Sequence, residues 1–209
     1  MQKPTPIEEF DAAVREHAPE FGSAIDDSLA ARLSHYYSLL MKWNARLHLV
    51  APCPADEFAT RHVLESLLLV RHVPAEAHVT DVGSGAGLPS IPCLLARPDI
   101  RATLIDSSQR KAVFLKEAVR ALELTDRAEV IAARFQDIAA PPTDVVTCRA
   151  LERFERVLPA LIAWAPPEST LLLFGGNRLR TQLQGLRPQI EAELIPTSER
   201  RFLIIASPK

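Results

Sequence analysis

The chain has 209 residues, of which 47% are hydrophobic and 24% are charged, and this is the composition of a globular protein with one substantial core. The formal net charge of −2 excludes the strong basic excess of a general nucleic-acid binder, and no apolar run approaches the roughly 18 residues of a membrane span. Cys53, Cys93 and Cys148 form no C-x-x-C pair, which argues against a disulfide framework or a zinc site and favours a reducing compartment.

Two helices are predicted within the first 75 residues. The N-terminus has no apolar segment of the kind found in secretory signals, so a cytoplasmic location is expected. Apolar residues then recur at steps of four and three from Leu29 to Leu47, which is the period of one helix face. A second helix is expected over residues 56–72. We expect residues 1–75 to form a helical extension that packs on the rest of the chain.

Strands that alternate with helices are expected after residue 75. This alternation predicts an α/β fold over residues 76–209, with a mainly parallel sheet and helices on both faces. The helix over residues 109–122 is expected to turn Val113, Phe114, Ala118 and Leu122 inward. The expected strands cover residues 77–82, 102–106, 128–132, 144–148 and 170–174, with a closing pair at 195–197 and 202–206. The other expected helices cover residues 91–96, 154–164 and 179–186.

The segment from Asp81 to Pro89 carries the clearest functional signal. Gly83, Gly85 and Gly87 stand at every second position, where they let the backbone turn sharply and approach a ligand. The dinucleotide fingerprint is G-x-G-x-x-G, so a third glycine one position early disfavours a nicotinamide dehydrogenase. A G-x-G-x-G loop after an acidic residue looks like the first motif of methyltransferases that use S-adenosylmethionine (AdoMet). The alternative is a strand-to-helix turn that binds nothing.

The ends of the next two expected strands supply further candidates, because ligands of parallel sheets lie at the carboxyl ends of strands. Asp106 can accept the ribose hydroxyls of an adenosine, or it can simply cap a turn. Phe135 can cover the adenine face, with Gln136 or Asp137 at the adenine edge. The alternative is that Phe135 is only a core residue and Asp137 a helix cap.

Arg149 follows the fourth expected strand, at the place where a transferred methyl group should lie. A guanidinium there can bind an RNA phosphate or the carboxylate of the cofactor through two hydrogen bonds. The alternative is a salt bridge with Glu152 or Glu155.

Five motifs together resemble one family in their order and spacing. The family is RsmG, also called glucose-inhibited division protein B, and the similarity runs from about residue 30 to the end. The glycine loop is shared by many methyltransferases, whereas Trp43-Asn44, Arg61-His62 and Arg149-Ala150 are far more selective. The motifs are residues 39–49 (LLMKWNARLHL), 61–66 (RHVLES), 81–89 (DVGSGAGLP), 147–150 (TCRA), and Asp106-Ser107 with Arg110-Lys111 and Phe114-Leu115.

This resemblance implies a Rossmann-like, AdoMet-dependent methyltransferase that modifies N7 of a guanine in 16S rRNA. The family's cofactor contacts fall on Gly83, Leu88, Phe135, Gln136 and Arg149, and the ribose contact falls on Asp106. The full set of expected cofactor-binding residues is Asp81, Gly83, Ser84, Gly85, Gly87, Leu88, Asp106, Ser107, Phe135, Gln136 and Arg149. The chain departs from the family at Ser90, Gln136 and Gly175-Gly176, where glycine, glutamate and Lys-Gly are usual.

Guanine N7 carries a lone pair and no proton, so the implied reaction needs no general base, and no metal is expected. We expect catalysis by positioning, with Arg149 in that role and with Phe174 or Arg149 stacked on an exposed base. The expected partner is 16S rRNA in the small ribosomal subunit, with no DNA, no membrane and a monomeric chain. The alternatives are a small-molecule methyltransferase and a non-catalytic module that binds AdoMet or a nucleotide together with RNA.

Overall fold

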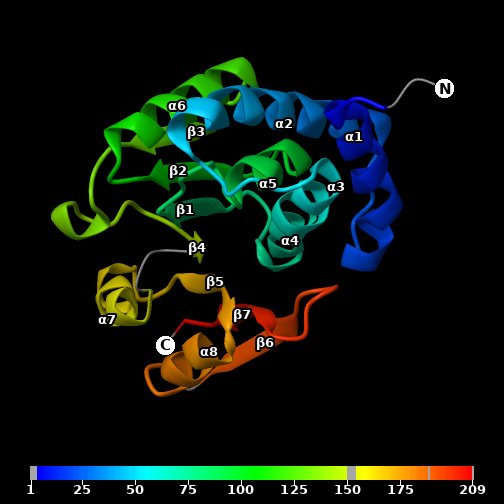
Figure 1. Cartoon of the computed structure of the whole chain (residues 1–209). Helices are drawn as coiled ribbons and strands as arrows, with labels where there is room; N and C mark the ends of the chain where they lie inside the picture. Colours follow the sequence, from blue (N-terminus) through cyan, green and yellow to red (C-terminus); the bar gives the residue numbers. More distant parts are fainter. Residues whose placement is uncertain (1–3, 150–153, 188, 209) are drawn as a thin grey trace.

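A seven-stranded sheet forms the centre of the computed structural model, which describes residues 4–149, 154–187 and 189–208. The strands are β1 (His78–Val82), β2 (Arg101–Ile105), β3 (Ala128–Ile131), β4 (Val145–Arg149), β5 (Thr170–Gly176), β6 (Ile190–Leu194) and β7 (Arg201–Ala206). Their order is β3-β2-β1-β4-β5-β7-β6, as Figure 1 shows. The first five strands pair in parallel, and β7 is antiparallel to both β5 and β6. The predicted, mainly parallel sheet is therefore confirmed.

Helices cover both faces of this sheet, as predicted. Side chains alternate along β5, so that Leu172 belongs to one hydrophobic cluster while Leu171 and Leu173 belong to the other. The first cluster packs against α5 (Ser90–Ala96), α6 (Gln109–Ala121) and the N-terminal helices. The second packs against α7 (Phe154–Trp164) and α8 (Asn177–Gln184), which lie apart from α6 and α2 (Asp27–Leu47) in Figure 1.

The chain begins with a helix that the sequence reading did not predict. It is α1 (Pro6–His17), followed by the short turn η1 (Ala18–Phe21). Thr5 caps α1 by accepting from the backbone N–H of Glu8, whose carboxylate accepts from the backbone N–H of Thr5. Phe10 on α1 is fully buried and stacks on Tyr37 of α2 with ring centroids 4.5 Å apart. Thr5 and Glu8 have the spacing of a capping box, so the sequence contained a signal for the start of this helix.

The second predicted helix exists but is not uniform. It runs through α3 (Ala55–Phe58), the π-helical turn η2 (Ala59–Leu64), α4 (Glu65–Leu67) and the 3-10 turn η3 (Leu68–His72). A π turn widens the helix by one residue per hydrogen bond and changes which carbonyls face the neighbouring strands. This turn contains Arg61 and His62, two residues of the selective motifs.

Two local predictions were wrong. Val113 was expected to face the core, but its side chain is 55% exposed on α6, while Phe114, Ala118 and Leu122 are buried as predicted. The first strand of the closing pair is β6 at residues 190–194 and not at 195–197. Thr197 has φ of +62°, a turn conformation that a continuing strand does not adopt.

The hydrophobic core runs across residue 75. One cluster contains Phe10 and Leu33 from the N-terminal helices together with Val79 and Leu104 from the sheet. The division into residues 1–75 and 76–209 stays a prediction, and the shared core argues that both parts fold as one unit. No helix in the described ranges is long and apolar enough to cross a membrane.

Candidate cofactor and substrate site

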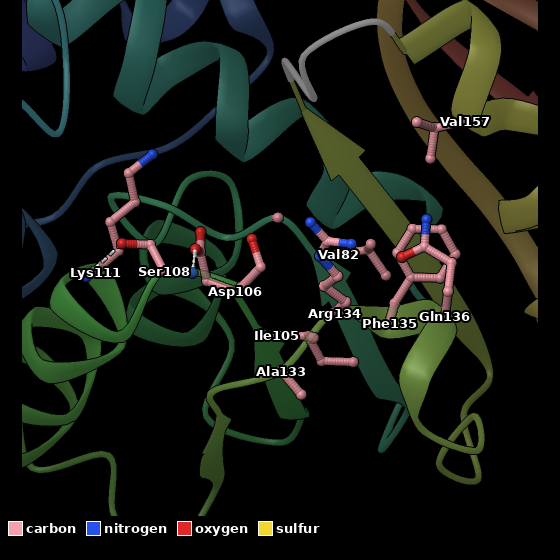
Figure 2. Close-up of a pocket in the computed structure, with 12 residues that line it drawn as sticks. Val82, Ile105, Asp106, Ser108, Lys111, Ala133, Arg134, Phe135, Gln136 and Val157 are labelled. Carbon is pink, nitrogen blue, oxygen red and sulfur yellow. Dashed lines mark hydrogen bonds between the residues drawn. The ribbon is translucent and has the colours of Figure 1, made fainter.

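A cavity of about 410 Å³ lies beside the carboxyl ends of β1 and β2 and the turn after β3. Five of the predicted residues line it, and Figure 2 shows Asp106 opposite Phe135 and Gln136 across the opening. Ligands of parallel sheets bind at this edge. The predicted residues on the wall are Gly83, Asp106, Ser107, Phe135 and Gln136, and the other residues on it are Val82, Ile105, Ser108, Lys111, Ala133, Arg134 and Val157.

The glycine loop has the backbone shape that the sequence predicts. Gly83, Gly85 and Gly87 have φ values of +79°, +54° and +85°, in the region that side chains disfavour. The N–H groups of Gly83 and Ser84 both donate to the carbonyl of Ile105, at 2.8 and 3.1 Å, which ties the loop to the end of β2. A Cβ atom on Gly87 would lie 2.3 Å from Cδ1 of Ile91, so the third glycine is also required for close packing on α5.

Asp106 joins the glycine loop to the start of α6. Its Oδ2 accepts from the N–H of Gly85 and its Oδ1 from the N–H of Ser108, both at 2.8 Å. The turn-cap alternative is therefore present in the structure. Each carboxylate oxygen can accept more than one hydrogen bond, so these contacts leave acceptor capacity toward the cavity. The ribose role stays a prediction that the geometry allows.

Asp81 lies beneath the glycine loop and does not line the cavity. Its side chain is fully buried, and neither carboxylate oxygen has a hydrogen-bond partner among residues 4–149, 154–187 and 189–208. Burial raises the pKa of Asp81 to about 7, more than the nearby hydroxyls of Ser90 and Ser84 lower it. The Ser84 hydroxyl donates instead to the backbone carbonyl of Asp81 at 2.9 Å. A buried carboxylate without partners beside a cavity is typical of a functional site.

The position of Phe135 is compatible with both of the roles that the sequence left open, and the adenine contact stays a prediction. Phe135 lines the cavity, yet it is buried and meets Trp164 of α7 edge to face, with centroids 5.4 Å apart. Gln136 is exposed on the same short turn, η4 (Phe135–Asp137). The wall also contains two cations, Lys111 and Arg134, whose place there was not predicted. Lys111 belonged to a quoted motif, and the position of Arg134 between the third expected strand and the predicted residue Phe135 was the signal that could have placed it.

Arg149 is the last residue of β4 and lies outside the cavity wall. Its guanidinium donates to the backbone carbonyls of Arg61 and His62 and, at 3.4 Å, to the hydroxyl of Ser66. It also pairs with the Glu65 carboxylate at 3.1 Å. The salt bridge was expected with Glu152 or Glu155; Glu152 and Ala150 lie outside the described residues. Arg149 therefore fastens the π-helical turn to the sheet.

The neighbourhood of Arg149 is a compact polar cluster at the ends of β4, β5 and β7. Arg149 lies over the Phe174 ring, 5.5 Å from its centroid. Glu65 is almost fully buried, and its second oxygen pairs with Arg201 at 2.5 Å. Burial and the positive charge of Arg149 lower the pKa of His62 to about 4, so this imidazole is neutral near pH 7.

Other motif residues serve the local structure. The Asn44 amide donates to the carbonyl of Val50 at 3.2 Å and accepts from its N–H at 3.0 Å, which turns the chain after α2.

Gly175, where the family usually has lysine, packs so closely on α8 that a Cβ atom would lie 2.4 Å from Cδ2 of Leu179. A lysine at Gly175 would therefore require the Leu179 side chain or α8 to shift. Gly87, Leu88 and Ser84 are buried within the loop.

Residues 29–202 match the family model of rRNA small subunit methyltransferase G. The chain belongs to this family. Its resemblance to the RsmG family is thereby confirmed. It is 40% identical to the rRNA small subunit methyltransferase G of Gluconobacter oxydans over 156 residues, which cover 73% of this chain and 77% of the relative. It is 35% identical to the same protein of Halorhodospira halophila over 175 residues, covering 84% and 82% of the two chains.

Solved structures support the fold of this family member. The tRNA methyltransferase TrmK of B. subtilis superposes with a TM-score of 0.56 at 14% identity, covering 69% of this chain and 66% of that one. TYW2 of M. jannaschii, solved in complex with AdoMet, has a TM-score of 0.56 at 13% identity and covers 69% and 73%. These similarities confirm the predicted Rossmann-like methyltransferase fold.

Proposed function

We propose that this protein transfers the methyl group of AdoMet to N7 of a guanine in the 16S rRNA of the small ribosomal subunit. The family match over residues 29–202 carries this conclusion. The cavity beside the glycine loop supports it with a place for the methyl donor. Ribosomal subunits are assembled in the cytoplasm of bacteria, so a cytoplasmic location belongs to the proposal, as does a monomeric enzyme.

The described residues fit AdoMet. The glycine loop brings backbone close to the cavity, because Gly83 lines it and the N–H of Gly85 donates to the cavity residue Asp106 at 2.8 Å. In the proposed site Asp106 accepts the ribose hydroxyls, Phe135 packs against the adenine, and Gln136 meets the adenine edge. The buried carboxyl group of Asp81, whose pKa burial raises to about 7, lies beneath the loop and would supply negative charge there once the positively charged AdoMet is bound. When bound, AdoMet supplies an electrophilic methyl group on a positively charged sulfur.

The proposed reaction mainly requires that the guanine and the methyl group are held in the right position. The reaction forms a bond between N7 and the methyl carbon and breaks the bond from that carbon to sulfur. No proton leaves N7, so no base is required, and the low pKa of about 4 keeps His62 neutral beside this site. Arg149 and Phe174 lie together at the carboxyl ends of β4 and β5. We place the target guanine there, held in line with the methyl group, so that the entropy of alignment is lost on binding.

The test uses methyl-labelled AdoMet and small ribosomal subunits from a strain that lacks this protein. The labelled RNA is digested and the modified nucleotide is identified by mass. Label at guanine N7 of 16S rRNA is the expected result. Label in no RNA, together with intact binding of AdoMet, would contradict the proposal and favour a small-molecule substrate or a non-catalytic module.

Replacing Asp106 by asparagine is expected to weaken AdoMet binding by about 1–3 kcal/mol, since a charged acceptor is lost. The change also places an N–H donor against the N–H of Gly85 or Ser108. Isothermal calorimetry with AdoMet measures the effect. Asp99→Asn is the matched control. Asp99 lies in the connection that precedes β2, at the opposite edge of the sheet, and its carboxylate likewise accepts from a backbone N–H, that of Glu76. Unchanged affinity in Asp106→Asn would remove Asp106 from the ribose site.

A further inference from the structure

Tyr36 connects the N-terminal helices to the centre of the glycine loop. It lies in the middle of α2, its side chain is fully buried, and its hydroxyl donates to the backbone carbonyl of Ala86 at 2.8 Å. The two residues are 50 positions apart in the chain. In the sequence, Tyr36 lies at one of the positions of the helix face predicted from Leu29 to Leu47. The structure makes it a polar contact to the loop that faces the proposed cofactor site.

This hydrogen bond holds one end of a peptide unit whose other end is also held. The N–H of Gly87 donates to the carbonyl of Ser84 at 2.6 Å, while the carbonyl of Ala86 accepts from Tyr36. Gly85 and Gly87, on either side of Ala86, both have positive φ. Glycine can adopt more backbone conformations than other residues, so this segment needs contacts that select one of them. Two fixed ends therefore select one orientation of the Ala86–Gly87 peptide.

The site is buried, so water does not readily replace the Tyr36 hydroxyl as the donor to the Ala86 carbonyl. Ala86 is only 5% exposed, so its carbonyl would remain buried without a partner if the hydroxyl were removed. Tyr36 is also a donor at every working pH, because burial raises its pKa well above the ordinary value, more than the positive charge of Arg149 lowers it. The phenol thus acts as a neutral, permanent hydrogen-bond donor to the loop.

We propose that Tyr36 is a positioning residue of the methyl-donor site. Its hydroxyl orients the Ala86–Gly87 peptide, and through it the backbone of the glycine loop, whose first glycine, Gly83, lines the cavity assigned to AdoMet. This inference rests on the proposed function, because it assigns AdoMet to the cavity. It makes α2 a part of the cofactor site, although α2 contributes no residue to the cavity wall.

Tyr36→Phe is the direct test, since it removes one oxygen atom and keeps the ring that packs in the core. We expect AdoMet to bind about tenfold more weakly by calorimetry, with a similar rise in KM for AdoMet and little change in kcat at saturation. Hydrogen exchange at the amides of Gly85 and Gly87 is expected to accelerate. A role confined to stability would lower the unfolding temperature and leave the affinity of the folded protein unchanged.

Tyr37→Phe is the matched control, because it removes the same atom from the next residue. Tyr37 points to the other side of α2, where it packs on Phe10 and Phe58. The Tyr37→Phe variant should bind AdoMet as tightly as the wild type does. Equal affinities of Tyr36→Phe and wild type, or equal losses in both variants, would overturn the proposal. Binding is measured without RNA, so wild-type protein that binds AdoMet but leaves 16S rRNA unlabelled contradicts only the proposed reaction.

Should Tyr36→Phe fail to fold, hydrogen exchange of the wild type decides the question. The amide of Gly87 is then expected to be protected before AdoMet is added, because the peptide is already oriented. Unprotected exchange in the free protein, with protection only in the presence of AdoMet, would overturn the proposal.

Discussion

Replacing Gly87 by alanine is expected to lower the free energy of unfolding by about 3 kcal/mol and kcat/KM for AdoMet by about a hundredfold. Two costs coincide at this position. An alanine at φ of +85° is strained by about 1–2 kcal/mol. Its Cβ atom would also lie 2.3 Å from Cδ1 and 2.7 Å from Cγ1 of Ile91, so either α5 or the loop must shift. A shift of the loop displaces the groups that would hold the methyl donor.

Two further glycine variants separate these costs. At Gly85 an alanine would have φ of +54° with no atom closer than 3.7 Å, so only backbone strain is expected. At Gly185, the C-cap of α8, φ is −72° and the nearest atom is 3.5 Å away, so alanine should be tolerated. Denaturant unfolding should therefore rank the losses as Gly87, then Gly85, then Gly185. Equal stability of all three variants would contradict the packing argument.

The cofactor-free protein is expected to lose stability as the pH rises from about 4 to about 7, and Asp81 is the cause. The pKa of Asp81 is about 7 in the folded chain, above the ordinary value of about 4 for an aspartate. Between these values the folded protein holds a proton that the unfolded chain has released. The stabilisation is thus complete below about pH 4 and is lost as the pH rises through 7. Its size is on the order of 4 kcal/mol.

Urea unfolding of wild type and Asp81→Asn across this pH range measures the effect. The wild-type curve should fall more steeply with pH, and the variant should be the more stable protein at neutral pH. Asp99→Asn is a control whose curve should run parallel to the wild type from pH 4 to 7, since Arg97 lowers the pKa of Asp99 and its stabilisation is lost only as the pH falls below about 4. Parallel curves for wild type and Asp81→Asn would show that Asp81 does not titrate in this range.

Adding AdoMet extends the same experiment to the proposed site. The sulfonium and ammonium groups of AdoMet are positive, and a nearby positive charge lowers the pKa of a carboxyl group. The pH dependence of wild-type stability should therefore flatten when the methyl donor is present. An unchanged slope with bound AdoMet would separate Asp81 from the site.

The sequence by itself determined the features that depend on local order. The period of apolar residues located α2, α6 and all five parallel strands, because helix and strand periods are properties of short segments. The glycine spacing fixed the positive-φ loop for the same reason, since glycine alone adopts those angles without strain. The strand ends then indicated Asp106, Phe135 and Gln136, which the structure brings to one cavity.

Only the tertiary structure decided which distant groups meet. Arg149 binds carbonyls of Arg61 and His62, nearly ninety positions earlier, and no local pattern specifies such a contact. Tertiary packing also decides that Asp81 is buried without a hydrogen-bond partner and that Tyr36 donates to the carbonyl of Ala86. Hydrogen bonds and desolvation depend on distances set by packing, whereas sequence periodicity specifies only which face of an element is apolar.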